Sequence, residues 1–413
     1  MNITLNDLLF AFSRALDFVE KDLLGITTNH GKRVANMSMR LCRAIGMTES
    51  EIFDMASCAI LHVNALTAYM LQFGEKNYAR LEGIKIHCEI GEKNVKGFPF
   101  LTDTTDVILY HHENWDGSGF YGLQKEAIPQ RSAILRIADN IDLQLNLGKS
   151  HTSIVNDVHA HTIAHRGTLY APSIVEAFND TFTKQCIDEM SDDHIDICIA
   201  HSLPQVGHRL STQELLDVCQ MFAKIIDAKS HFTHNHSQGT ARIAAHMGQY
   251  YKFDKQHCQK LEIAGFLHDI GKLAVPISIL EKAGSLTPEE QAIIAKHSNL
   301  TLEILEDIAG LEDIALWAGN HHERLDGSGY GKNLHGDKLD FETRLIACCD
   351  IYQALTEERP YRKASNHKEA IAILRDMVKQ KLIDGGIVED MNIHLKNFTL
   401  PSSSLPHDII RYT

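Results

Sequence analysis

A spacing of histidines that occurs twice is the feature that most constrains how this chain can fold. In the first half, gaps of 32, 25, 24, 1 and 27 residues separate five histidines and an aspartate: His30, His62, His87, His111, His112 and Asp139. In the second half, the gaps are 32, 29, 24, 1 and 28 residues, and the positions are His236, His268, His297, His321, His322 and Asp350. Agreement over six positions is not expected by chance, so the sequence predicts two copies of one domain.

The boundary between the copies is predicted from residues that interrupt helices. Pro204 and Gly207 are helix breakers. Ser211 then stands three residues before Glu214, which is the spacing of a capping box at the start of a new helix. We therefore expect the first domain over residues 1–205 and the second over residues 206–413.

Helical patterns dominate both copies. Apolar residues recur at helical intervals after the boundary, and Thr287 and Pro288 followed by Glu290 are typical of a helix start. Strand-like alternation is scarce, so we predict an all-α fold made of two tandem helical domains. The first 24 residues carry charges between apolar side chains, which indicates an amphipathic helix rather than a signal peptide.

The composition limits the partners and the compartment. The 413 residues include 40 basic and 54 acidic ones, and this net charge of −14 argues against binding long nucleic acids through a basic surface. We expect no apolar run as long as a membrane span, and hence no membrane partner. Nine cysteines occur without a Cys-x-x-Cys pair and without an export signal, so we expect reduced thiols and a cytoplasmic location.

Two neighbouring residues of the second copy carry groups that are costly to bury. His268 and Asp269 lie in an apolar segment, FLHDIGKL, where an imidazole and a carboxylate need partners. Such groups are ligands that Mn²⁺, Fe²⁺ and Zn²⁺ prefer. With Asp269, the second copy offers seven of them, more than one site with open positions would use. The pattern therefore predicts a two-metal centre, in which ions about 4 Å apart can activate water and clamp a phosphate.

These residues resemble the motifs of a known family. His268 and Asp269 with Lys272 resemble the HD superfamily of metal-dependent phosphohydrolases. The segment HHERLDGSGYG together with DIYQALTEERPYR (350–362) resembles the HD-GYP branch of that superfamily. Members of the branch hydrolyse cyclic dinucleotides, chiefly cyclic di-GMP, and some act on 3′3′-cyclic GMP-AMP. The resemblance covers residues 215–365, and the first copy resembles a degenerate member of the branch.

The resemblance implies a function and a site for the second copy. It is expected to be a cyclic dinucleotide phosphodiesterase that produces a linear dinucleotide with a 5′-phosphate. Asp269 and Lys272 are the implied catalytic residues, and Asp269 is the implied bridge between the metals. The implied cofactors are two divalent metal ions, Fe, Mn or similar, held by His236, His268, Asp269, His297, His321, His322 and Asp350. Contacts with the substrate are implied for Lys272, Arg359, Tyr361 and Arg362.

Several positions depart from the family pattern. Gly331 replaces the proline of the GYP signature, which puts the loop geometry and the substrate preference in question, and Gly239 replaces an arginine. In the first copy, Val63 replaces the bridging aspartate and Leu66 replaces the lysine, so hydrolysis is not expected there. The first copy could support the active one, bind a regulatory ligand, or bring a second protomer together in a homodimer.

Other functions fit part of the pattern. A mononucleotide phosphohydrolase or 5′-nucleotidase would use the same chemistry, and a di-iron oxygenase would use a similar scaffold. A sensor would bind a cyclic dinucleotide without cutting it. Lys272 and the arginines beside Tyr361 favour a phosphate substrate over an oxidisable one. The complete ligand set of the second copy weighs against a sensor.

Overall fold

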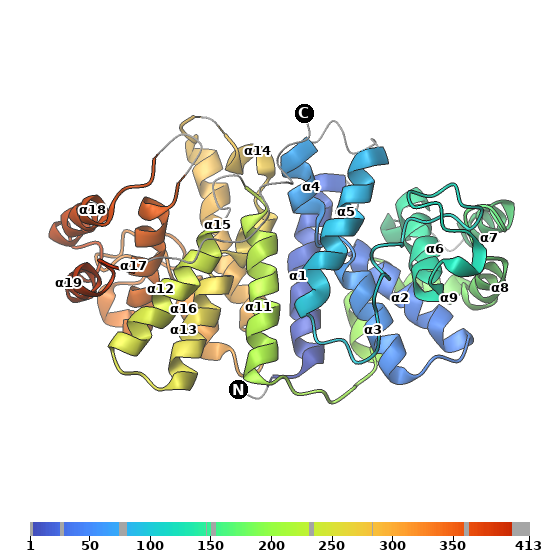
Figure 1. Cartoon of the computed structure of the whole chain (residues 1–413), viewed down its shortest axis with the longest axis horizontal. Coiled ribbons are helices and arrows are strands. Elements are labelled where there is room, and N and C mark those ends of the chain that lie inside the picture. The colour runs from blue at the N-terminus through green and yellow to red at the C-terminus, as the bar shows by residue number, and fades with distance from the viewer. Residues whose placement is uncertain are drawn as a thin grey trace.

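Helices make up the regular structure of this chain. The computed structural model describes residues 3–24, 29–73, 81–145, 147–149, 154–230, 235–282, 284–358 and 363–398. Within these ranges the chain forms α-helices, 3-10 helices and isolated β-bridges, and no β-strand (Figure 1). The predicted all-α fold is therefore confirmed.

The elements follow one another in a similar order in the two halves. Those of the first half are α1 (Leu5–Leu24), α2 (His30–Ala44), α3 (Glu49–Leu61), α4 (Leu66–Phe73), α5 (Leu81–Asn94), η2 (Val95–Gly97), η3 (Lys125–Ala127), α6 (Gln130–Leu145), η4 (Leu147–Lys149), α7 (Val155–Ala164), α8 (Pro172–Thr181), α9 (Lys184–Glu189) and α10 (Ile195–Ser202). Those of the second half are α11 (Thr212–Asp227), α12 (His236–Tyr250), α13 (Lys255–Leu267), η6 (Ile270–Ala274), α14 (Ile277–Leu280), α15 (Pro288–Leu305), α16 (Glu312–Gly319), η7 (Gly336–Lys338), α17 (Phe341–Thr356), α18 (His367–Lys379) and α19 (Gly385–His394).

Equivalent helices have equal lengths where they carry the repeated residues. Helices α2 and α12 are both 15 residues long, and each begins at the first histidine of its repeat. Helices α3 and α13 are both 13 residues long and end one residue before His62 and His268. Helices α6 and α17 are both 16 residues long and carry Asp139 and Asp350. The duplicated spacing thus corresponds to a duplicated arrangement of helices.

The predicted helix starts are confirmed by their caps. The Ser211 hydroxyl accepts from the backbone N–H of Glu214, and the Glu214 carboxylate accepts from the backbone N–H of Ser211. Thr287 and Glu290 form the same box at the start of α15, with Pro288 as its first residue. These caps satisfy N–H groups that have no partner inside the helix.

Helices α1 and α11 lie side by side where the two halves meet (Figure 1). The buried rings of Phe12 and Phe222 stack with their centroids 3.7 Å apart. Helix α1 also contacts η6 and α15 of the second half. Helix α1 spans Leu5–Leu24, so the predicted helix in the first 24 residues is confirmed. Both halves pack on this helix, and its Asp17 is buried and forms an ion pair of 2.7 Å with Lys32.

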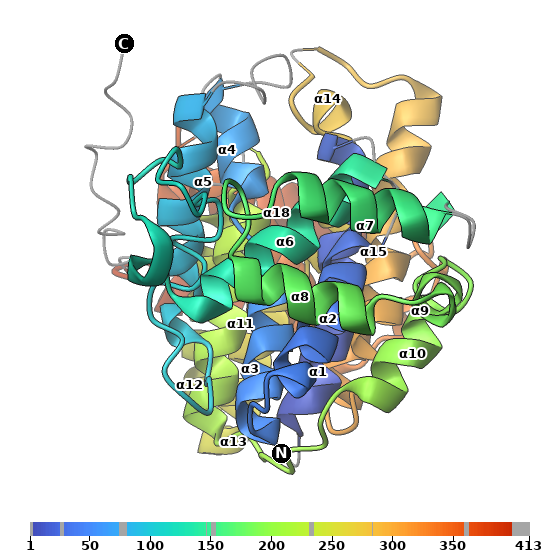
Figure 2. The same ribbon diagram turned by 90° about the vertical axis from the view of Figure 1, so that its right-hand side faces the viewer.

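The outer side of the first half is covered by its later helices. Helices α8 and α10 pack against α2, and α7 packs against α8 (Figure 2). This layer adds Asp192 and Asp196, which pair with Arg33 and Lys32 of α2.

The expectation that no apolar run reaches the length of a membrane span is wrong for one stretch. Residues Glu49–Tyr69, which include α3 and the start of α4, are long and apolar enough to pass that test. Within the fold, however, 94% of the apolar 18-residue window in this stretch is buried. Helices α1 and α2 pack against α3, and α1 packs against α4, so the stretch belongs to the core of the first half.

Replacing Phe222 by alanine should weaken the contact between the halves. We expect a loss of about 3–5 kcal/mol in the free energy of unfolding, because a buried aromatic ring leaves a cavity. Urea unfolding followed by circular dichroism would measure it. Leu316→Ala is the control, since Leu316 is 46% exposed and its loss should change stability by less than about 0.5 kcal/mol. Equal effects of the two variants would contradict the packing described.

Candidate metal centre

One group of predicted ligands gathers where α12, α13 and α17 meet. His236 is the first residue of α12, His268 follows the last residue of α13, and Asp350 lies within α17. The Nε2 atoms of His236 and His268 lie 2.9 and 3.7 Å from Oδ1 of Asp350. One ligand atom from each residue lies within 4.8 Å of the others, so a single ion could contact all three.

A second group lies beside the first and includes the predicted bridge. Nε2 of His297 and Nε2 of His321 lie 3.4 and 3.7 Å from Oδ1 of Asp269. His322 completes the group, again with all ligand atoms within 4.8 Å of one another. Helix α15 carries His297, and the paired histidines follow the end of α16.

The carboxylate of Asp269 faces both groups. Its Oδ2 lies 3.4 Å from Nε2 of His268 and 3.8 Å from Nε2 of His236, while Oδ1 faces the histidines of the second group. The structure thus brings all seven predicted ligands together. A carboxylate with one oxygen toward each group is the arrangement that a bridging ligand requires.

Local hydrogen bonds orient three of the histidines for metal binding. The Nδ1 atoms of His268, His297 and His321 lie 2.8, 2.6 and 2.5 Å from backbone carbonyl oxygens three residues earlier. Since a carbonyl can only accept, each Nδ1 carries the proton and donates it, and in a neutral ring Nε2 keeps a lone pair.

Several of the inward-facing atoms are buried without a hydrogen bond. They are Nε2 of His297, Nε2 of His321 and Oδ1 of Asp269. Burying such atoms without a partner costs about 1–3 kcal/mol each. Coordination to divalent ions would remove this cost, so the residues fit a metal centre.

Burial and neighbouring charges set the ionisation of the centre. Burial opposes charge on Asp269, but His268 and Lys272 outweigh it and hold the pKa of the carboxyl well below its usual range. Burial and the neighbouring His268 lower the pKa of His321 to about 3. For His268 burial lowers the pKa, but Asp269 and Asp350 outweigh it and raise the pKa to about 9. A divalent cation would therefore compete with the proton on His268 for the two carboxylates.

Lys272 reaches the bridging carboxylate from the partly open side of the centre. Its Nζ lies 2.5 Å from Oδ2 of Asp269, and its side chain is 20% exposed. The ring of Tyr330 lies over His322 with 4.4 Å between centroids. His322 is 23% and Tyr330 36% exposed, so a phosphate group could approach the centre on the side of Lys272 and these two rings.

Glu323 is a positioning residue that the sequence reasoning missed. Its Oε1 and Oε2 accept hydrogen bonds from the backbone N–H groups of Lys332 and Leu334, at 2.5 and 2.9 Å. In the first half, Glu113 accepts from Tyr121 and Leu123 in the same way, at 2.9 and 2.8 Å. The signal was present, because both copies read His-His-Glu. The glutamate holds the loop that carries Tyr330.

Gly331 has a backbone conformation that explains the absent proline. Its φ is +130°, whereas proline is restricted to a φ near −65°. A Cβ at this position would also lie 3.0 Å from Oε1 of Glu323. The loop after Tyr330 therefore follows a path that the family's proline could not adopt.

The other departure in the second half, Gly239, lies beside a residue that also differs between the two halves. A Cβ at Gly239 would lie 2.3 Å from the side chain of Gln353. The equivalent residues of the first half are Arg33 and Asp142, which form a buried ion pair. The amide end of Gln353 occupies the space next to residue 239, so an arginine there would have to displace that flexible side chain.

The segment after α17 is described only in part. Arg359, Tyr361 and Arg362, which were predicted to contact substrate, lie outside the described residues. Glu357, just before them, has Oε2 3.7 Å from Nδ1 of His236 and accepts a hydrogen bond from the backbone N–H of Asn235. Sequence reasoning missed Glu357 too. The contacts of Glu357 place the end of α17 beside the group of His236, His268 and Asp350.

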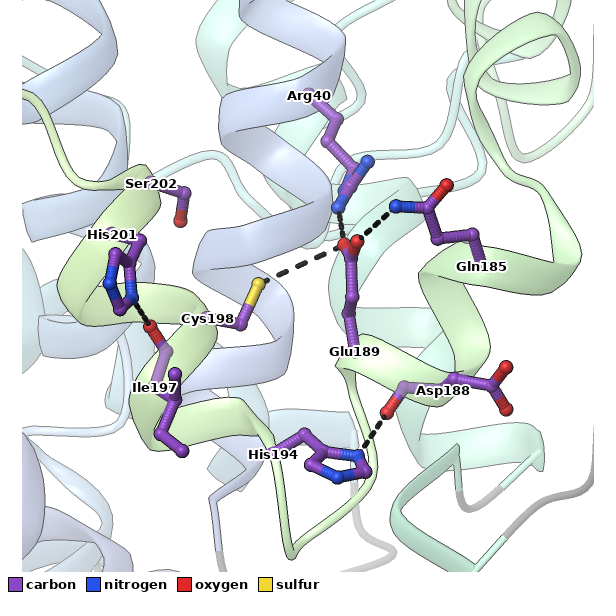
Figure 3. A pocket seen from close by; sticks show the side chains of 9 residues that line it. All are labelled: Arg40, Gln185, Asp188, Glu189, His194, Ile197, Cys198, His201 and Ser202. Carbon is purple, nitrogen blue, oxygen red and sulfur yellow. Dashed lines mark hydrogen bonds and ion pairs between the residues drawn. The ribbon is translucent and has the colours of Figure 1, made fainter.

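A cavity of about 610 Å³ lies elsewhere, at the edge of the first half (Figure 3). Its described lining includes none of the predicted site residues. Its cation, Arg40, forms an ion pair with Glu189, and Gln185 also donates to Glu189. Because its arginine is already paired with Glu189 and it holds none of the predicted ligands, this cavity is a weaker candidate for the active site than the metal centre.

Comparisons with known proteins agree with the geometry. The family model described as HD domain matches residues 20–145 and 220–387. A 3′3′-cGAMP-specific phosphodiesterase of Vibrio cholerae is 30% identical over 401 residues, covering 94% of this chain and 91% of the relative. A cyclic di-GMP phosphodiesterase of Pseudomonas aeruginosa is 28% identical over 266 residues, 63% of this chain and 59% of that protein.

A solved structure shares the fold. The crystal structure of a cyclic GMP-AMP specific phosphodiesterase of Vibrio cholerae matches with a TM-score of 0.66 and 23% identity. The match covers 97% of this chain and 99% of that one, so the arrangement of helices is shared over both halves.

Removing the Glu323 carboxylate should release the loop that carries Tyr330. A hydrogen bond to a charged group contributes about 1.5–3 kcal/mol, so Glu323→Ala should speed amide exchange at Lys332 and Leu334 about tenfold or more. Hydrogen exchange read by mass spectrometry would measure it. Glu113→Ala is the matched control and should affect Tyr121 and Leu123 instead. Unchanged protection of the second loop in Glu323→Ala would contradict the role.

An alanine at Gly331 should destabilise the same loop. The φ of +130° is strained for any residue with a Cβ, so Gly331→Ala should cost about 1–3 kcal/mol. Thermal unfolding would measure the loss. Gly284→Ala is the matched control, because a Cβ there meets nothing within 4 Å and no left-handed φ is required. If both variants melt together, the strain inferred at Gly331 is absent.

Proposed function

Because this chain belongs to the HD-GYP family of HD-domain phosphohydrolases, we propose that its second half hydrolyses a cyclic dinucleotide. One observation carries the proposal: Asp269 has one carboxylate oxygen toward each of the two groups, and Lys272 lies 2.5 Å from this carboxylate. Metal-dependent phosphodiesterases need both features, since the substrate phosphate must be polarised and its charge balanced.

The proposed cofactors are two divalent ions such as Fe²⁺ or Mn²⁺. When bound, they would supply Lewis-acid activation of water and charge neutralisation at the phosphate. His236, His268 and Asp350 would hold one ion, and His297, His321 and His322 would hold the other. Asp269 would contribute one oxygen to each, and its pKa well below the usual range keeps it ionised for this role.

The proposed reaction adds one water across one phosphodiester linkage. The water oxygen bonds to phosphorus, the bond from phosphorus to the 3′ oxygen breaks, and the 3′ oxygen takes up a proton. The phosphate stays on the 5′ oxygen, which gives a linear 5′-phosphorylated dinucleotide. In this scheme the Lys272 ammonium turns from Asp269 to a phosphoryl oxygen, where it offsets the negative charge that develops.

The choice of substrate within this class rests on how much of the chain aligns with a relative of named specificity. The Vibrio cholerae relative that aligns with 94% of this chain is named for 3′3′-cGAMP. We therefore propose 3′3′-cyclic GMP-AMP as the first substrate to test, with cyclic di-GMP as the second. Arg359, Tyr361 and Arg362 stay predicted contacts for the nucleotide.

The roles proposed for the two halves follow from the two site residues that the first half lacks. Residues 206–413 would carry the catalysis, and residues 1–205 would not, because Val63 and Leu66 are buried apolar side chains at the positions of Asp269 and Lys272. All nine cysteines are free, which is compatible with the proposed cytoplasmic location.

Removing the shared carboxylate should abolish turnover. The purified chain would be incubated with Mn²⁺ or Fe²⁺ and, in separate reactions, with 3′3′-cyclic GMP-AMP, cyclic di-GMP, cyclic di-AMP or a mononucleotide. Chromatography would then separate the products. We expect the linear 5′-phosphorylated dinucleotide from one of the first two. Asp269→Asn should lower the rate about 100-fold or more, since even indirect partners of metal ligands cost 10–100-fold. Lys272→Ala should lower kcat with little loss of metal.

The control for Lys272→Ala is Lys260→Ala, because Lys260 pairs with Asp313 on the surface of α13. This variant should keep the full rate. Turnover of the mononucleotide alone would support the 5′-nucleotidase alternative. Tight binding of a cyclic dinucleotide without cleavage would support the sensor, and a normal rate in Asp269→Asn would refute the site.

A further inference from the structure

The first half keeps one of the two ligand groups in nearly the same geometry. Nε2 of His30 and Nε2 of His62 lie 3.2 and 3.6 Å from Oδ1 of Asp139, and the three residues are buried. The corresponding distances in the second half are 2.9 and 3.7 Å. One ligand atom from each residue lies within 4.8 Å of the others.

Hydrogen bonds on the far side orient both imidazoles toward this point. Nδ1 of His62 donates to the carbonyl oxygen of Ala59 at 2.6 Å, which in a neutral ring leaves a lone pair on Nε2. Nδ1 of His30 lies 2.6 Å from the carboxylate of Asp142. A carboxylate behind a histidine is the usual support of a metal ligand, because it fixes the ring and raises the basicity of the other nitrogen.

This support is stronger in the first half than in the second. Arg33 donates two hydrogen bonds to the Asp142 carboxylate, of 2.6 and 3.1 Å, and so fixes this carboxylate beside Nδ1 of His30. In the second half, the nearest carboxylate oxygen to Nδ1 of His236 is that of Glu357, at 3.7 Å. The first half has therefore lost the bridge and the lysine but kept the group that orients its first histidine.

The remaining atoms distinguish this group from its neighbour. Oδ2 of Asp139 is buried without a hydrogen bond. The other group of the first half consists of His87, His111 and His112 with Cys88, and it lacks a carboxylate. Nδ1 of His87 is also buried without a hydrogen bond, so that ring lacks the support that its equivalent, His297, receives.

We propose that His30, His62 and Asp139 bind one divalent transition-metal ion that ties α2, α3 and α6 together and takes no part in hydrolysis. Two imidazoles and one carboxylate suit Fe²⁺, Mn²⁺ or Zn²⁺. The site is not expected to hydrolyse a phosphodiester, because Val63 cannot bridge to a second ion and Leu66 carries no charge that could contact a phosphate. The proposal does not rest on the proposed phosphodiesterase activity.

Counting bound metal in the full-length chain tests the site. Equilibrium dialysis against Co²⁺, followed by elemental analysis, would compare the wild type with Asp139→Asn and His62→Ala. Each variant should bind about one ion fewer per chain. His87→Gln, in the neighbouring group, is the matched control and should bind as many ions as the wild type. Equal counts in all four proteins would mean that His30 is only a charged partner of Asp139 and Asp142, and would overturn the site. A loss in His87→Gln alone would overturn the assignment.

A second measurement leaves the first half intact. The variant Asp269→Asn/Asp350→Asn removes the two carboxylate ligands proposed for the second half and should still bind about one Co²⁺. Adding Asp139→Asn to it should abolish that binding. Absence of bound Co²⁺ in the double variant would overturn the proposal even if the wild type cleaves cyclic dinucleotides. Retained binding in a wild type that cleaves none would refute the phosphodiesterase alone.

Discussion

The buried carboxylate of Asp269 is the group on which the second half depends. It is 1% exposed, and it stays charged because the Lys272 ammonium and the His268 imidazole face its Oδ2. Its Oδ1 has no hydrogen bond, which leaves that oxygen for a metal ion. Helices α12, α13, α15 and α17 each bring at least one of these partners or a neighbouring ligand. The same carboxylate is what divides seven ligands into two groups with one shared member. Without it, one group of three histidines and one group of two histidines and Asp350 remain, and the first half has groups at the equivalent positions.

The first half contributes to the second through its own first helix. Helix α1 contacts η6, the short element that carries Lys272, and α15, which carries His297. The stacked Phe12 and Phe222 fix α1 against α11 at the same junction. The first half therefore packs directly against elements that carry residues of the candidate metal centre. Since α1 precedes its own ligand group by only a few residues, an ion held there would stiffen the element that joins the two halves.

Sequence reasoning selected the seven residues that the structure brings together, because their spacing is duplicated and because buried imidazoles and carboxylates need partners. It missed Glu323, whose partners are backbone amides that no side-chain pattern reveals. It could not connect Gly239 with Gln353, because residues over a hundred positions apart are recognised as neighbours only in space. The membrane-length stretch at Glu49–Tyr69 shows a further limit. Composition alone does not tell a core segment from a span, and only the helices packed around it do.

The orientation that the histidines of the first half keep has a local physical cause. The equivalent histidines His62 and His268 both bond through Nδ1 to a carbonyl three residues earlier in their own helix end, and so do His111 and His321. Their orientation is set by the turn of backbone they follow and not by the carboxylate they face. Replacing the bridging aspartate by valine therefore removes the shared ligand without turning these rings. The first half therefore has valine and leucine in place of the aspartate and the lysine, while His62 and His111 keep the orientation of their equivalents.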